Sequence, residues 1–256
     1  MPRLRGLLSL SLSFAALAGA TSIACSEDAL APDEAFAADD TAPVTEEAQA
    51  KIDAFTRDGS AFDSAPPETS GFGFLHAVAQ RLYSGFDGVH EFAIPVGFRG
   101  GGEDLTVVAD DPAAANVTSV KATTPRPGPP TAYFMVTPKK AGLLAITATS
   151  GTQKVTARIA VAAYEPAQWE TGAARYANGG ANPACSSCHV TGRAHDHSPT
   201  ALATVTDGDV AKIMTLGQKP GPTTITEVDH RWSMTDDERR GLIVYLRSLE
   251  PRGFSE

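Results

Sequence analysis

Residues 89–164 alternate between short apolar runs rich in β-branched residues and clusters of turn-forming residues. Around Ile146, and again from Val155, apolar and polar residues alternate with a period of two. Strands with one buried face show this period, because successive side chains point to opposite faces of a sheet. The pattern predicts six strands: Val89–Val96, Leu105–Ala109, Val117–Lys121, Ala132–Thr137, Leu143–Thr149 and Val155–Ala163.

Turn clusters such as Gly100-Gly101-Gly102 and Pro138–Gly142 separate these strands. About 75 residues of short, regularly spaced strands are typical of a β-sandwich. The run from Pro138 through Ser150-Gly151 to the last strand resembles the ending of bacterial immunoglobulin-like domains. We therefore expect residues 71–165 to form an immunoglobulin-like β-sandwich.

From Pro166 onward the apolar residues follow a helical period, which predicts helices over Ala167–Asn178, Asp207–Leu216 and Thr235–Leu249. Thr235 can cap the third helix, with Glu238 as its reciprocal partner three residues later, and Pro251 ends it. Its apolar stripe consists of Leu242, Tyr245, Leu246 and Leu249.

The N-terminus has the features of an export signal. Arg3 and Arg5 precede an uncharged apolar run, Leu7–Ala20, which is shorter than the ~20 residues that span a bilayer. Ser22-Ile23-Ala24-Cys25 resembles a bacterial lipobox, which implies a signal peptide over residues 1–24 and lipidation of Cys25; ordinary cleavage near Ala24 is the alternative. Ser26 after the cysteine resembles lipoproteins sent to the outer membrane, so we expect an exported protein of the cell envelope, facing the periplasm or the cell surface.

The formal net charge of −9 argues against a nucleic-acid partner, which needs a basic face. Much of that charge lies in residues 25–70, which hold few large apolar residues and are predicted to be a disordered acidic linker. Its twelve acidic residues are Glu27, Asp28, Asp33, Glu34, Asp39, Asp40, Glu46, Glu47, Asp53, Asp58, Asp63 and Glu68.

Cys185-Ser186-Ser187-Cys188-His189 is the attachment signature of c-type haem. Two thiols separated by two residues can reach both vinyl groups of one porphyrin edge and form thioethers, while the adjacent His189 supplies the proximal iron ligand. With Cys25 lipidated, one covalent haem uses the remaining two of the three cysteines. No structural disulfide is then expected.

Three other uses of the two thiols compete with haem. A zinc site could combine them with two histidines drawn from His189, His195 and His197. A thioredoxin-like redox pair needs a βαβ setting that the pattern lacks, and a plain disulfide is the third alternative.

From Gln168 to Pro251 the chain resembles class I c-type cytochromes. Gly172 and Tyr176 stand on the helix before the attachment motif, where this family carries a glycine and an aromatic residue that contact the last helix. Pro199 follows the motif, and Tyr245 stands where the family carries the aromatic residue of the last helix. The resemblance implies that residues 166–256 form an all-α cytochrome c domain, so the predicted fold is multidomain, a β-sandwich followed by that domain.

The sixth iron ligand departs from the family, which usually carries a methionine shortly before its last helix. Here His230 occupies that stretch, and we expect it to be the distal ligand, with Met234 and Met214 as alternatives. Met214 lies inside a predicted helix and is expected in the core. His195, His197 or an open position are further alternatives.

A haem with two protein ligands has no vacant site and serves electron transfer. We therefore expect a lipid-anchored monohaem cytochrome that carries single electrons between redox proteins by transient contact. The alternatives are the haem subunit of a peroxidase or dehydrogenase, and a sensing or binding module that uses the β domain.

Overall fold

The computed structural model describes residues 74–120, 131–179, 182–189, 197–221, 223–226 and 228–252. The predicted signal peptide, the lipidation site Cys25 and the acidic linker lie outside the described residues, as does His195.

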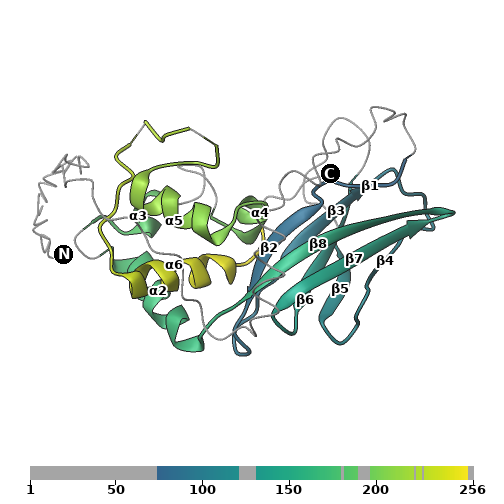
Figure 1. Cartoon of the computed structure of the whole chain (residues 1–256), viewed down its shortest axis with the longest axis horizontal. Helices are drawn as coiled ribbons and strands as arrows, with labels where there is room; N and C mark the ends of the chain where they lie inside the picture. The colour runs from purple at the N-terminus through teal and green to yellow at the C-terminus, as the bar shows by residue number, and fades with distance from the viewer. Residues whose placement is uncertain are drawn as a thin grey trace, which may run out of the picture. The chain divides into compact units, whose positions relative to one another are not determined.

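In the described part of the chain, eight strands form two four-stranded sheets (Figure 1). The first sheet is antiparallel and has the order β1 (His76–Ala77), β3 (Ile94–Arg99), β6 (Thr131–Pro138) and β5 (Ala115–Val120). The second has the order β2 (Arg81–Phe86), β8 (Gln153–Ala163), β7 (Gly142–Ser150) and β4 (Thr106–Ala109). In this sheet β2 runs parallel to β8, and the other pairs are antiparallel.

The two sheets share one hydrophobic core. Alternate residues of each strand point into it, as the period-two pattern predicts. Ile94 and Val136 of the first sheet are fully buried in the same cluster as Ile146 and Ile159 of the second. The sheets therefore pack as a sandwich, which is compatible with the immunoglobulin-like part of the prediction.

All six predicted strands overlap observed ones, but the first overlaps β3 only in part. The predicted Val89–Val96 begins too early, since the strand starts at Ile94. The reason is a turn in which Asp87 Oδ1 accepts hydrogen bonds from the backbone N–H groups of Val89 and His90. Gly88 in this turn has a φ of 78°, a conformation that suits glycine.

The helices are α2 (Pro166–Asn178), α3 (Cys185–Cys188), α4 (Pro199–Leu202), α5 (Asp207–Leu216) and α6 (Asp236–Arg247). The three predicted helices are confirmed, with ends within two residues of those expected. Thr235 and Glu238 form the predicted capping box at the start of α6.

The predicted fold class is nevertheless wrong, because the helices are not an all-α cytochrome c domain. The described residues are mostly β-sheet, with a few short helices of 4 to 13 residues. Phe92 and Tyr164, which flank strands of the sandwich, are buried in the cluster under the helices, and Ala203 is buried with the sandwich core. All described residues fall within one compact unit, Pro32–Glu256. Helical periodicity showed which helix faces are apolar, but it could not show that strand residues help to cover them.

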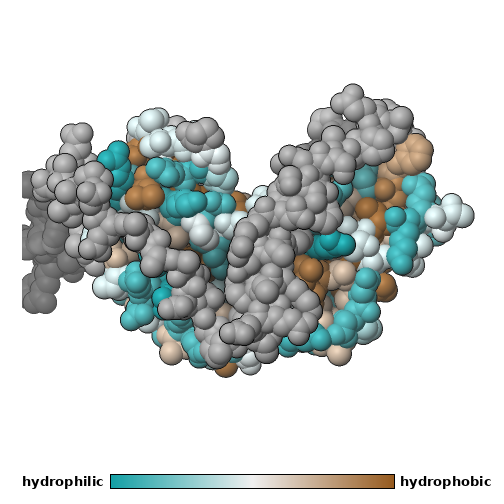
Figure 2. Space-filling view, in the orientation of Figure 1, coloured by the Kyte–Doolittle hydropathy of each residue, from teal (hydrophilic) through white to brown (hydrophobic). Residues whose placement is uncertain are grey.

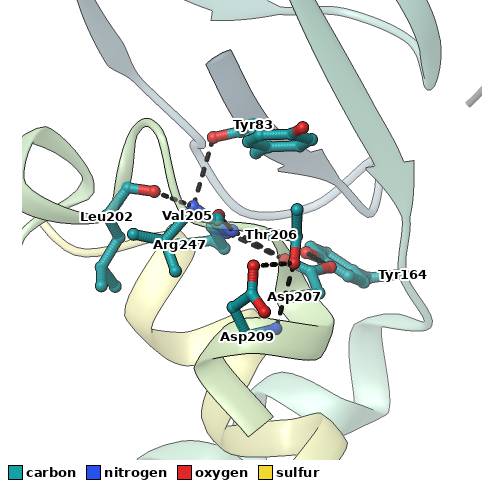
Figure 3. Close-up of polar contacts among 8 residues, drawn as sticks. All are labelled: Tyr83, Tyr164, Leu202, Val205, Thr206, Asp207, Asp209 and Arg247. Atoms are coloured by element: carbon teal, nitrogen blue, oxygen red, sulfur yellow. Dashed lines mark hydrogen bonds and ion pairs between the residues drawn. The ribbon is translucent and has the colours of Figure 1, made fainter. Parts of the chain in front are cut away.

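A buried arginine joins the helices to the sandwich (Figure 3). Arg247 on α6 is 1% exposed and donates to Asp207 Oδ1 at 2.8 and 3.1 Å. It also donates to the backbone carbonyls of Tyr83 on β2, Leu202 and Val205. Burial alone would lower the pKa of Arg247, but the negative charge of Asp207 raises it overall, so the guanidinium stays charged.

Tyr164, at the end of β8, donates its hydroxyl to Asp207 Oδ2 at 2.6 Å. Burial and the Asp207 charge raise the pKa of this phenol, which therefore stays neutral. Asp207 thus receives donors from both the sandwich and α6.

Among the described residues, no helix is long and apolar enough to cross a membrane. On the face drawn in Figure 2, hydrophobic residues form small patches separated by hydrophilic ones. Of the large hydrophobic side chains that are exposed, three lie on different elements and the others lie outside the helices and strands: Val108, Leu143 and Leu216, then Phe74, Val78, Val89 and Val228.

Candidate functional site

A tight turn brings the cysteine motif back against α2. Gly179 ends α2 with a φ of 72°. A Cβ at this position would lie 2.3 Å from the backbone nitrogen of Ala184, so no larger side chain fits. The turn delivers the chain directly to α3, which holds the two cysteines.

The motif occupies one helical turn. The backbone N–H of His189 donates to the carbonyl of Cys185 at 2.9 Å, which closes that turn. Cys185, Cys188 and His189 therefore stand at positions i, i+3 and i+4, which share one face of a helix. Two thiols and one imidazole are presented together.

The two thiols differ in their surroundings. Cys185 is 4% exposed and belongs to the cluster under the helices, whereas Cys188 is half-buried, and both are free thiols. Burial raises the pKa of Cys185 to about 11, against a smaller opposing effect of the Arg175 charge. A redox-active thiol pair uses a lowered pKa, so the raised value does not favour the thioredoxin-like alternative.

His230 is held at the C-terminal end of α5. Its Nδ1 lies 2.8 Å from the carbonyl oxygen of Ile213, an acceptor, so Nδ1 carries the proton. The backbone N–H of Trp232 donates to the carbonyl of Met214 at 3.0 Å, and the Trp232 ring stacks on His230 with centroids 5.2 Å apart. These contacts orient the ring and leave Nε2 as the basic nitrogen, as in metal-binding histidines.

The rings of His189 and His230 lie close together although 41 positions separate the two residues in the sequence. Their ring centroids lie 6.1 Å apart and their planes are nearly perpendicular, at 87°. Metal–imidazole bonds are about 2 Å long, so two imidazoles on opposite sides of one metal ion have centroids roughly 6 Å apart. The observed separation matches that of two axial ligands on one iron.

The two methionines considered as sixth ligands lie in the hydrophobic cluster under the helices. Met214 is 5% exposed and belongs to the core, as its place inside α5 predicts. Met234 is half-buried, packs against the same cluster and directly precedes the cap residue of α6. Both are accounted for as packing residues.

His197 lies closer to the motif than the sequence pattern showed. Its ring stacks on that of His189, with centroids 3.4 Å apart and planes 25° from parallel. Sequence reasoning named His197 only as an alternative ligand. The one available signal was its place shortly after the motif and two residues before Pro199.

The packing that the cytochrome resemblance implies between the first and last helices is present. Tyr176 on α2 and Tyr245 on α6 have ring centroids 5.1 Å apart. Gly172 lies so close to α6 that an added Cβ would be 1.9 Å from the carbonyl oxygen of Gly241. Gly241, which sequence reasoning missed, is the matching small residue on α6.

The donor set fits a c-type haem. Two thiols on one face of a helical turn suit two thioether bonds, and the 6.1 Å separation of the His189 and His230 imidazoles would suit the two axial positions of iron. In the described ranges of the chain, no group of three or more His, Cys, Asp or Glu side chains is placed to hold a metal ion by itself.

The sequence matches no protein-family model, and no curated protein matches it. Among solved structures, the chain is similar to domains 4 and 5 of the S-layer protein SbsC, with a TM-score of 0.25 and 16% sequence identity. The match covers 35% of this chain and 51% of that one, about half of its length.

Proposed function

We propose that this protein is an exported monohaem c-type cytochrome, anchored by a lipid on Cys25 to the outer membrane, that carries single electrons between redox proteins. The observation that carries the proposal is the close pair of rings, His189 and His230, whose centroids lie 6.1 Å apart, with His189 directly after the second cysteine of the motif. The spacing of the motif and the separation of the rings are independent of each other, and both suit one haem.

Each cysteine has a defined role in the proposal. The Cys185 and Cys188 thiols each add across one vinyl group, so that a C–S bond forms and the thiol hydrogen passes to the second vinyl carbon. A haem bound there supplies a one-electron iron(III)/iron(II) couple. Covalent attachment keeps the group in place outside the cell.

In the haem-loaded protein, each histidine would hold one axial position. His189 is fixed by the helical turn that carries both cysteines, and His230 by the bond of its Nδ1 to Ile213. With both positions filled there is no site for substrate, which favours electron transfer over catalysis. Partners of such carriers meet them through small, transient interfaces.

The test is haem loading of the full-length chain in a host with haem-maturation machinery. We expect haem to stay with the polypeptide after denaturation, and the C185A/C188A double variant to lose this covalent link. A colourless protein, or stoichiometric zinc bound through the thiols, would contradict the proposal.

Substitution of His230 tests the distal ligand. His230→Met should raise the reduction potential and introduce the weak long-wavelength absorption band of sulfur ligation, because a thioether replaces an imidazole. Met214→Leu and Met234→Leu are the matched controls and should leave the wild-type spectrum unchanged. A high-spin iron that binds added ligands rapidly in the wild-type protein would indicate an open position and an enzymatic role instead.

A further inference from the structure

The plane of the proximal imidazole is set by a neighbouring ring. His197 lies face to face with His189, at a centroid distance of 3.4 Å and an interplanar angle of 25°. Flat rings in this contact resist rotation, since turning one of them brings its edge into the other. The stack therefore restricts the orientation of His189 about the axis that points toward a bound metal.

The His197 ring also contacts α2. Its ring meets Tyr176 of α2 edge-on at 6.0 Å, and Tyr176 packs on Tyr245 of α6 at 5.1 Å. Tyr245 in turn contacts Trp169 at 5.4 Å, and the Trp169 indole donates to Ser248 Oγ at 2.7 Å. The stack thus rests on the crossing of two helices, so its position is fixed by packing rather than by one contact.

The opposing imidazole is fixed independently. The Nδ1 bond to Ile213 and the Trp232 ring, at an angle of 22°, hold His230. Between the two fixed rings the angle is 87°. Each plane is thus set by its own neighbours, and the crossed arrangement follows from the protein.

We infer that His197 is a positioning residue that holds the imidazole of His189 crosswise to that of His230, so that an iron between them has perpendicular axial planes. The inference rests on the proposed function. Parallel axial planes separate two of the iron d orbitals in energy, whereas crossed planes leave them nearly equal. A nearly equal pair gives low-spin iron(III) an unusually anisotropic set of g values.

The test is frozen-solution electron paramagnetic resonance of the oxidised, haem-loaded full-length protein. The wild type should show a single highly anisotropic low-spin signal. His197→Ala should broaden it or shift it toward the rhombic signal of parallel imidazoles, while His197→Phe, which keeps a flat ring, should retain it. His76→Ala is the control, because this exposed-strand histidine bonds only locally to Phe74 in the described contacts.

Tyr176→Leu is a second variant, which keeps His197 and removes the aromatic ring that contacts it. It should broaden the signal, and it keeps the test decisive if His197→Ala does not fold. A rhombic signal in the wild type, or an unchanged signal in both His197→Ala and Tyr176→Leu, would overturn the inference. A colourless wild-type protein would overturn the proposed function as well, and sulfur-ligated or high-spin iron would overturn the distal assignment together with this inference.

Discussion

At the scale of single residues, the sequence predicted the arrangement of the site only for residues that lie close together along the chain. Cys185, Cys188 and His189 are four positions apart at most, so their spacing alone places them on one face of a turn. The positions of His230 and His197 next to His189 depend on the path that the chain takes after α5 and after the motif, respectively. No local pattern encodes that return, and the stack of His197 on His189 was therefore missed.

The difference between the two thiols gives a prediction for the haem-free chain. Because its pKa is about 11, Cys185 has about a hundredfold less thiolate at pH 8 than a thiol with a pKa of 9.0. Thiolate is the reactive form, so iodoacetamide should modify Cys188, the more exposed thiol, well before Cys185. Peptide mass spectrometry over time measures both rates.

The pH dependence of that reaction has a definite sign. The thiolate fraction of a group with a raised pKa keeps growing until the pH passes that value. Alkylation of Cys185 should therefore accelerate about tenfold per pH unit from pH 8 toward its pKa of about 11. Equal rates for the two thiols at pH 8 would show that Cys185 is not buried as described.

At the scale of elements, helix ends were predictable because their caps are local. Thr235 caps α6 as predicted, and Thr206, which the sequence analysis did not name, caps α5 at the predicted start of that helix. The first strand was misplaced because the turn at Asp87 uses a side-chain acceptor within an otherwise β-like run. The strand β2 went unpredicted, since its pairing partner β8 lies more than 70 positions further along the chain.

The crossing of α2 and α6 gives a prediction about stability. Gly172→Ala places a Cβ 1.9 Å from the Gly241 carbonyl oxygen, a backbone atom that cannot move aside easily. Overpacking at such a contact should lower the free energy of unfolding by about 3 kcal/mol. Urea titration of the haem-free full-length chain measures the change.

Gly208→Ala is the control on another helix. Its added Cβ meets nothing closer than 3.9 Å, so stability should change by less than about 1 kcal/mol, in the stabilising direction. If Gly172→Ala also changed the free energy of unfolding by less than about 1 kcal/mol, the two helices would not cross as closely as described.

At the scale of the whole molecule, the sequence did not show how the helices are covered. An arginine in a helical pattern is expected at the surface, yet Arg247 is 1% exposed and bonds the carbonyl of Tyr83 on β2. The hydrophobic period shows which face of a helix or strand is apolar, but it does not show which other element packs against that face. For this reason the individual strands and helices were predicted, while the clusters that join them were not, and the helices were wrongly assigned to a separate all-α domain.

The buried arginine gives the prediction at this scale. Arg247→Met keeps much of the volume but removes the guanidinium donors to Asp207 and to three carbonyl groups. Removing one partner of a buried ion pair should lower the free energy of unfolding by about 3 kcal/mol. Circular dichroism during urea unfolding measures this loss.

Lys140→Met is the matched control, because its ion pair with Asp111 is more than half exposed on both sides. Such a pair contributes at most about 1 kcal/mol. If the two variants lost the same stability, Arg247 would not be the link between helices and strands that its contacts indicate.

The parallel pairing of β2 with β8 has a mechanical consequence. The chain enters the second sheet through β2 and leaves it for the helices through β8, and six residue pairs join these two strands in register. Tension applied from opposite ends of a parallel pair acts in shear, so the backbone bonds along the ladder must yield together rather than one after another. A pulling force applied at the N-terminal side of β2 would therefore have to break the hydrogen bonds between β2 and β8 together before it acted on the segment that carries the cysteines.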